Sequence, residues 1–165
     1  MKKLPGQDLE FIADNLKSVI KKLGNKHIFI TGASGFIGSW LVESIIYITE
    51  KSELNISISI LTRDKAKFIA NYPHLNSYKL LNIIEGDIQE IQSGIIDEVD
   101  YIIHAATDTK NYLGGDNSDI ITSTIVEGTK NILEIARKQK KLKKLLFLSS
   151  GAIYGPRAID SQATK

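Results

Sequence analysis

The chain has 165 residues and a formal net charge of +2, with 42% hydrophobic and 24% charged residues. This length suits one ordinary domain, and the composition is that of a folded globular protein rather than a disordered chain. The charge balance is too even to indicate nucleic-acid binding, and the lack of Cys excludes disulfides and thiolate zinc sites.

No stretch approaches the roughly 20 apolar residues of a membrane span, and no apolar run follows the basic start as it would in a secretory signal. We therefore expect a cytoplasmic protein with neither a membrane nor a nucleic acid as partner. The densest basic run, residues 137–144, lies where a helix is predicted to end, and the helix dipole stabilises cations there. No partner pattern around His27 or His74 suggests a metal, so no metal site is expected.

The first predicted element is an amphipathic helix over 7–23, with apolar residues at three- and four-residue spacing and Gly24 as a stop signal. Its apolar face suits either the chain's own sheet or a second subunit, so a homodimer stays open. Short β-rich runs then alternate with helical patterns. Strands are expected at 27–31, 56–62, 81–85, 100–104 and 144–149, and helices at about 36–50, just after Asp64, weakly near 90–98, and over 118–140.

This alternation predicts right-handed βαβ crossovers and a mainly parallel, doubly wound sheet with helices on both faces. Five strands give the order 3-2-1-4-5, which is one strand short of a full dinucleotide-binding fold. The predicted fold class is therefore α/β and Rossmann-like, with an extra N-terminal helix. We expect residues 1–25 to form that helix and residues 26–165 to form an NAD(P)-binding domain.

A glycine-rich octet, Thr-Gly-Ala-Ser-Gly-Phe-Ile-Gly at residues 31–38, joins the first predicted strand of the sheet to the next helix. Its glycines allow a tight turn and a close backbone approach to a pyrophosphate, while the helix N-terminus supplies free N–H donors and a positive dipole end. A glycine turn alone is weak evidence, but the strand before it and the helix after it provide the required context. The residues expected at the cofactor are Gly32, Ser34, Gly35, Phe36, Ile37 and Gly38.

The G-x-x-G-x-x-G spacing of this octet resembles the signature of extended short-chain dehydrogenases/reductases, the NAD-dependent epimerase/dehydratase family of nucleotide-sugar enzymes. Four further stretches resemble the same family in the same order, and together the matches cover residues 27–156. They are Gly86-Asp87-Ile88, His104-Ala105-Ala106, the G-T-K-N-I-L-E run at 128–134, and the F-L-S-S-G-A-I-Y-G run at 147–155. One position departs: Ile125 stands where the family often has Asn.

The resemblance implies a role for each stretch. The Asp87 side chain and the Ile88 N–H would contact the adenine, and the small Ala105 and Ala106 would let the backbone approach the cofactor. Ser150 would be the catalytic hydroxyl that bonds the reacting sugar oxygen. A nucleotide sugar is the implied substrate.

Cofactor choice depends on the end of the second strand, where an acidic residue would hold the ribose hydroxyls of NAD. The chain has Thr62-Arg63-Asp64 there. Arg63 is suited to a 2′-phosphate, so NADP is modestly preferred over NAD. The alternative is a solvated Arg63 beside an Asp64 that only caps the next helix.

The family's reaction also requires a Tyr-x-x-x-Lys pair, which by resemblance lies roughly 25 residues beyond the catalytic Ser. Residue 165 is fifteen residues beyond Ser150, and the one Tyr-x-x-x-Lys, Tyr47 to Lys51, lies in a predicted helix far from the glycine loop. We therefore expect the NAD(P)-binding portion of an epimerase, dehydratase or decarboxylase that is inactive as this chain alone. Alternatives are a non-catalytic NAD(P)-binding sensor or scaffold module, or an NADPH-dependent reductase fragment.

Overall fold

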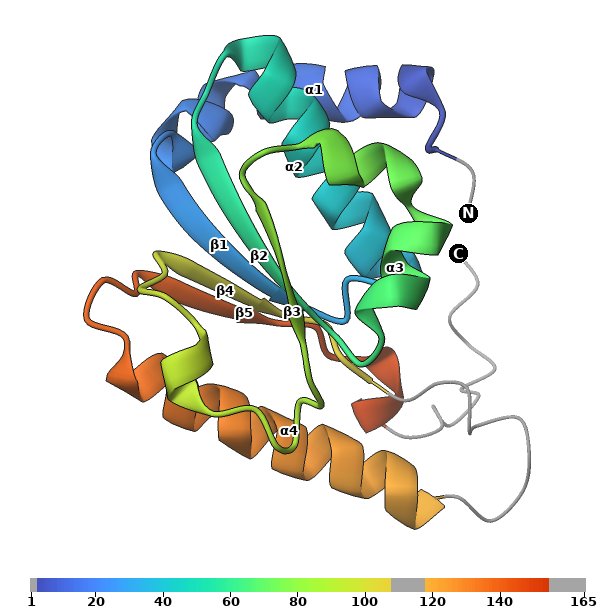
Figure 1. Ribbon diagram of the computed structural model, residues 1–165, viewed down its shortest axis with the longest axis vertical. Coiled ribbons are helices and arrows are strands. Elements are labelled where there is room, and N and C mark those ends of the chain that lie inside the picture. The colour runs from blue at the N-terminus through green and yellow to red at the C-terminus, as the bar shows by residue number, and fades with distance from the viewer. Residues whose placement is uncertain (1–2, 108–117, 155–165) are drawn as a thin grey trace, which may run out of the picture.

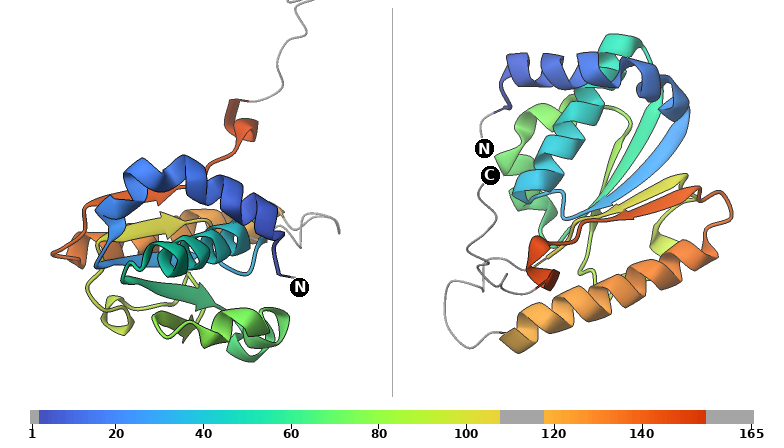
Figure 2. Two further views of the ribbon diagram at one scale, coloured as in Figure 1. Left: turned by 90° about the horizontal axis from the view of Figure 1, so that it is seen from above. Right: turned by 180° about the vertical axis from the view of Figure 1, so that it is seen from behind.

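The computed structural model describes residues 3–107 and 118–154. Figure 1 shows a sheet with α1, α2 and α3 on one side and α4 on the other. The helices are α1 (Gly6–Ile20), α2 (Phe36–Ser52), α3 (Lys65–Asn71) and α4 (Ser118–Lys138), and the strands are β1 (Lys26–Thr31), β2 (Ile56–Thr62), β3 (Leu81–Glu85), β4 (Tyr101–His104) and β5 (Lys144–Phe147). Figure 2 shows the same layers from above and from behind.

The five strands form one parallel sheet in the order β3-β2-β1-β4-β5, which confirms the predicted α/β class and strand order. The register pairs Ile30 of β1 with Ile60 of β2 on one side and with Ile103 of β4 on the other. All strands therefore end at the same edge of the sheet, where ligands of doubly wound folds bind.

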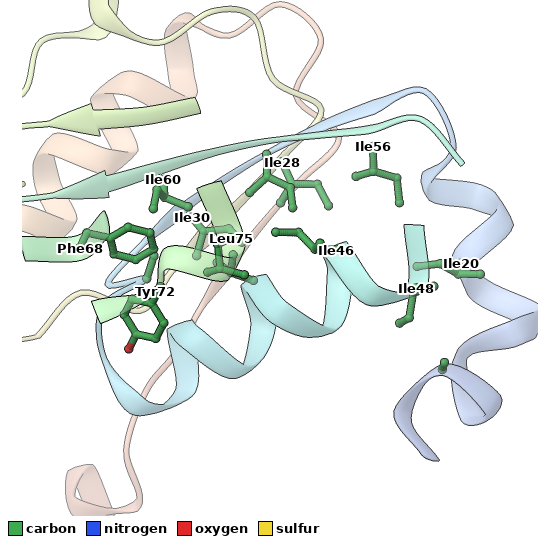
Figure 3. Packing of buried hydrophobic residues seen from close by; sticks show 14 residues of the cluster. Ile20, Ile28, Ile30, Ile46, Ile48, Ile56, Ile60, Phe68, Tyr72 and Leu75 are labelled. Carbon is green, nitrogen blue, oxygen red and sulfur yellow. The ribbon is translucent and has the colours of Figure 1, made fainter. Parts of the chain in front are cut away.

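The larger core lies between the sheet and the helices α1, α2 and α3 (Figure 3). Strand β2 alternates Ile with Ser, so that its isoleucines all point to this face while Ser59 points to the other and bonds His27. The residues that meet across this interface include Ile28, Ile30, Ile56, Ile58 and Ile60 from the strands, Ile46 and Ile48 from α2, Phe68 and Tyr72 from α3, and Ile20 from α1.

The second core lies under α4, where Ile132 and Ile135 pack against Phe29 of β1 and Ile102 of β4. Gly128 lets the helix pack closely on the segment that follows β3, because a Cβ at this position would stand 3.0 Å from the Ile88 side chain. The glycine and the isoleucines lie three to four residues apart, which is the spacing of one helix face. Helix α4 therefore covers β1, β4 and the end of β3.

The weak helix expected near 90–98 is instead a single 3-10 turn, Ser93–Ile95. The crossover from β3 to β4 contains Gly94, which disfavours helix, and its Ile91 and Ile96 anchor the second core individually. Apolar residues at about helical spacing thus reflect burial here rather than helix formation.

Strand β5 is packed much less than the others. Leu145 contacts the second core, whereas Leu146 is 55% exposed and Phe147 is 44% exposed. β5 also ends the described sheet, with β4 as its one neighbour there. This edge therefore carries open apolar surface that the β1 and β2 region does not.

Candidate functional site

The loop from β1 to α2 depends on glycine for its own packing. Gly32 has a φ of +73°, and a Cβ on it would stand 2.4 Å from the Ala105 carbonyl oxygen. A Cβ on Gly38 would stand 2.1 Å from the Gly32 oxygen. Both contacts are far below van der Waals distance, so no side chain fits at either position without moving backbone.

Gly35 differs from the other two glycines of the loop. A Cβ there would meet only the Gly32 oxygen, at 3.2 Å, a tight contact but one about 1 Å longer than that at Gly38. Gly35 is also the N-cap of α2, and no described side chain caps this helix end. The first-turn N–H groups therefore have no acceptor within the helix and, with the helix dipole, form a site suited to a phosphate.

A cavity of about 640 Å³ opens at this edge of the sheet. Its volume is within the range of small-molecule and cofactor sites. It brings together every residue that the sequence predicts at a dinucleotide, from four separate loops: Gly32, Ser34, Gly35, Phe36, Ile37, Gly38, Arg63, Asp87, Ile88, Ala105 and Ala106.

Beyond the end of β2, the carboxylate of Asp64 already forms a hydrogen bond within the chain. Its Oδ1 accepts a hydrogen bond of 2.7 Å from the Lys67 N–H and so caps α3. The exposed side chains of Arg63 and Lys67 both line the cavity, giving this end of it two cations. Lys67 was missed by the sequence interpretation, although it lies one helical turn beyond Asp64.

Asp87 follows β3 at the cavity wall. Its Oδ1 accepts from the Gln89 N–H at 2.9 Å, and its carbonyl accepts from the N–H groups of Glu90 and Ile91. The preceding Gly86 donates its N–H to the Thr62 carbonyl at 2.9 Å. These bonds hold the Asp87 carboxylate at the edge of the site.

Ser150, the predicted catalytic hydroxyl, lies three residues beyond the end of β5 and is exposed, but it is not among the residues that line the cavity. Its neighbours Leu148 and Ser149 do line it, as do Thr107 and Thr124. Thr124, from α4, was not predicted because no motif includes it. Tyr154 is 84% exposed in a 3-10 helix, Gly151–Tyr154.

His104 lies under the cavity and is 1% exposed. Its Nδ1 is 2.7 Å from the Thr31 hydroxyl and its Nε2 is 3.3 Å from the Thr129 hydroxyl. Burial lowers the pKa of this histidine, so the neutral ring is favoured. The sequence placed His104 only in the His104-Ala105-Ala106 stretch and did not predict these bonds of its ring.

Tyr47 and Lys51 are bound to α1 rather than to the site. Glu10 accepts a hydrogen bond from the Tyr47 hydroxyl and another from the Lys51 ammonium group. The bond to Glu10 and burial both raise the pKa of Tyr47, whereas a tyrosine base requires a lowered one. This pair therefore fastens α1 to α2 and has no place in proton transfer at the cavity.

Within residues 3–107 and 118–154, no helix is long and apolar enough to cross a membrane. In the same ranges, no three His, Asp or Glu side chains cluster in a way that suits a metal ion.

The model of the NAD dependent epimerase/dehydratase family matches residues 28–165. The dTDP-D-glucose 4,6-dehydratase of Dictyostelium discoideum is 33% identical over 140 residues, which cover 81% of this chain and 31% of the relative. The bifunctional dihydroflavonol 4-reductase/flavanone 4-reductase of Pyrus communis is 30% identical over 135 residues, covering 76% of this chain and 36% of the relative. The chain thus spans about a third of the length of these two relatives.

Solved structures show the same fold. The UDP-N-acetylglucosamine 4-epimerase of Methanobrevibacter ruminantium, in complex with UDP-N-acetylmuramic acid, has a TM-score of 0.67 and 21% identity over 86% of this chain and 43% of its own. The Bordetella bronchiseptica enzyme WbmF, in complex with NAD+ and UDP, has a TM-score of 0.57 and 22% identity over 76% of this chain and 36% of its own.

Proposed function

Since this chain belongs to the NAD dependent epimerase/dehydratase family, we propose that it is the nicotinamide-dinucleotide-binding portion of an oxidoreductase that acts on a nucleotide sugar. The observation that carries the proposal is the cavity at the carboxyl ends of the strands, which gathers the predicted cofactor positions around an uncapped helix end. When bound, the dinucleotide supplies a reversible hydride acceptor for a sugar carbon. The relatives named as nucleotide-sugar dehydratase and epimerase support the substrate class.

In this proposal, different residues of the chain contact different parts of the dinucleotide. The N–H groups at the start of α2, behind Gly35, hold the pyrophosphate, and Asp87 with the Ile88 N–H holds the adenine. Ala105 and Ala106 have no side chain beyond Cβ, so the nicotinamide half can lie against their backbone. Thr31 and His104, which lie behind this wall, are fully buried.

Gly35 provides the sharpest test of the cofactor site. A Cβ at Gly35 meets one atom, the Gly32 oxygen at 3.2 Å, far less severe than the contacts at Gly32 and Gly38, and the side chain would stand over the helix end where the pyrophosphate binds. Calorimetry should show that the wild type binds a dinucleotide and that a folded Gly35→Val variant does not. Gly94→Val, where nothing lies within 4 Å of the added Cβ, is the control and should bind as the wild type does. Undiminished binding by Gly35→Val would refute the site.

We further propose that NADP is preferred over NAD. The support is the pair of cations, Arg63 and Lys67, at the cavity end where Asp64 is occupied as a helix cap. Arg63→Ala and Lys67→Ala should each weaken NADP binding by about tenfold and leave NAD binding nearly unchanged. Lys65→Ala is the matched control, since Lys65 is exposed on the same helix but does not line the cavity. Equal NADP-to-NAD ratios in all four proteins would contradict the preference.

The same cation pair favours a second candidate, an NADPH-dependent reductase. Two reductases, the one from Pyrus communis and the vestitone reductase of Medicago sativa, are similar to this chain. The two candidates differ in substrate and share the cofactor site. Saturation-transfer NMR with UDP-sugars and with a flavanone would separate them.

We propose that these 165 residues bind the dinucleotide without turning over a sugar nucleotide. A hydroxyl proton must leave as the C–H bond breaks, and a positioned base contributes about 10²–10⁴-fold. Tyr47 and Lys51, the one Tyr-x-x-x-Lys pair of the sequence, are both bound to Glu10 and so do not serve as that base. Incubation with UDP- and dTDP-sugars should give no sugar product by mass spectrometry, a readout that also detects turnover in which the hydride returns and the nicotinamide band does not change. Sustained turnover that Ser150→Ala abolishes would contradict this proposal.

A further inference from the structure

His104 connects three parts of the fold behind the cofactor cavity. It is the last residue of β4, and its ring lies between the Thr31 hydroxyl at the end of β1 and the Thr129 hydroxyl of α4. Its ring centroid is 5.6 Å from that of Phe147, the last residue of β5. Its backbone carbonyl accepts the Leu148 N–H at 2.9 Å.

The direction of these hydrogen bonds depends on which ring nitrogen of His104 carries the proton. The Thr31 hydroxyl oxygen accepts the Ala106 N–H at 3.3 Å and lies 2.7 Å from Nδ1 of His104. With the ring proton on Nε2, the Thr31 hydroxyl donates to Nδ1, and Nε2 donates to the Thr129 oxygen 3.3 Å away. In that tautomer the hydrogen bonds run in one direction, from Ala106 through Thr31 and His104 to Thr129.

This network ends on the wall of the cavity. Ala105 and Ala106 line it, and the Ala105 carbonyl packs so closely on Gly32 that no Cβ fits between them. The Ala105 N–H is also held, by the Thr31 carbonyl at 3.3 Å. Thr31 and His104 are buried and do not line the cavity, so they act on it only through this backbone.

We propose that His104, as the neutral tautomer with its proton on Nε2, is a positioning residue that fixes the Ala105–Ala106 wall of the dinucleotide site through Thr31. The proposal rests on the proposed cofactor function and adds a residue to it. A preorganised wall costs the ligand no ordering on binding, so loss of the network should appear as weaker dinucleotide affinity.

The surroundings of His104 agree with a neutral ring. Its recorded partners are two hydroxyls and an aromatic ring, and none of them is charged. Burial lowers its pKa, with no opposing contribution from a carboxylate. A protonated ring would carry a hydrogen on Nδ1 and would no longer accept from Thr31.

The tautomer can be read without any ligand. Side-chain ¹⁵N spectra of the labelled chain distinguish a protonated from an unprotonated ring nitrogen, and only three histidines need assignment, with His104→Phe identifying the signal. The proposal predicts protonation at Nε2 and a free, acceptor-type Nδ1 at neutral pH. The opposite tautomer, or a doubly protonated ring, would overturn it.

Substitutions at both ends of the network test positioning. Thr31→Val keeps the branched shape that suits a buried strand but removes the hydroxyl, and it should weaken dinucleotide binding by about tenfold in calorimetry. Thr31→Ser keeps the hydroxyl and should recover most of that loss. Thr129→Val is remote from the cavity and acts only through the histidine, so it should weaken binding by about threefold.

A purely structural role predicts a different pattern. In that case Thr31→Val lowers the melting temperature but binds the dinucleotide as tightly as the folded wild type, and the proposal fails. Amide hydrogen exchange at Ala106 gives a readout that needs no ligand: the Thr31→Val variant should exchange faster there, and the Thr31→Ser variant should not. Unchanged Ala106 exchange in Thr31→Val also overturns the proposal. A wild type that binds neither NAD nor NADP refutes the cofactor site itself, while the tautomer and exchange results still decide whether His104 holds the wall.

Discussion

Strands β1 and β5 belong to the same parallel sheet, but their surroundings differ completely. Phe29 and Ile30 of β1 are fully buried between two helix layers and two neighbouring strands. Leu146 and Phe147 of β5 are about half exposed, at the end of the described sheet. The predicted cofactor contacts lie mainly on loops of the well-packed side, whereas Ser150 follows the exposed strand. The predicted cofactor contacts thus adjoin the buried part of the sheet, and the predicted catalytic hydroxyl adjoins its exposed strand.

The largest expected effect compares one side chain from each region. Phe29→Ala removes a fully buried ring from the second core and should lower the free energy of unfolding by about 3–5 kcal/mol. Leu146→Ala, at 55% exposure, should change it by less than about 0.5 kcal/mol. Urea denaturation of both variants and the wild type measures these differences. Equal losses would mean that β5 is buried in solution, for example by self-association, and would remove the contrast.

A smaller effect should separate glycines that pack from glycines that do not. Gly38→Ala places a Cβ 2.1 Å from the Gly32 oxygen and should cost about 1–3 kcal/mol of stability, because backbone has to move. Gly94→Ala has open space around its Cβ and should be neutral or slightly stabilising. Thermal unfolding followed by circular dichroism would compare the two. A neutral Gly38→Ala would show that the loop geometry described here is wrong.

The smallest effect is a pH slope that originates at His104. Burial holds the pKa of His104 in the folded chain below the ordinary histidine value of 6.5, so below that pH the unfolded chain takes up a proton that the folded chain does not. The free energy of unfolding should therefore fall as pH drops from 6.5 toward the lowered pKa, and His104 should add no slope above 6.5. Denaturation of wild type and His104→Phe at pH 7.5 and 5.5 tests this, because the gap between them should shrink at pH 5.5. Parallel behaviour at both pH values would show that His104 is not buried as a neutral ring.

Local sequence patterns were sufficient to predict most of the fold. The Ile-Ser alternation of β2 and the glycine loop after β1 each specify an element by a short-range rule, and the strand order followed from right-handed crossovers. The predicted helix near 90–98 failed because Ile91 and Ile96 reach the core from a loop rather than from one helix face. Burial and helix formation give the same spacing over so short a segment.

Those patterns could not predict contacts between residues that lie far apart in the sequence. The bond from Tyr47 to Glu10 joins residues 37 positions apart, and that from His104 to Thr31 joins residues 73 apart. Lys67 became a candidate contact for the 2′-phosphate of NADP only once the direction of α3 was known. The sequence identified which residues are chemically suited to a dinucleotide, and the structure added which backbone and side chains hold them in place.

Mapping the dinucleotide on the chain by NMR is the most direct test of the central claim, that the well-packed loops form the cofactor site. Backbone amide signals of the 18.3 kDa chain would be followed while NAD or NADP is added. We expect saturable shifts at Gly35, Arg63, Ile88 and Ala106, with α1 and the exposed face of β5 unaffected. Shifts confined to α1 or β5, or no saturable shifts with either dinucleotide, would contradict the account.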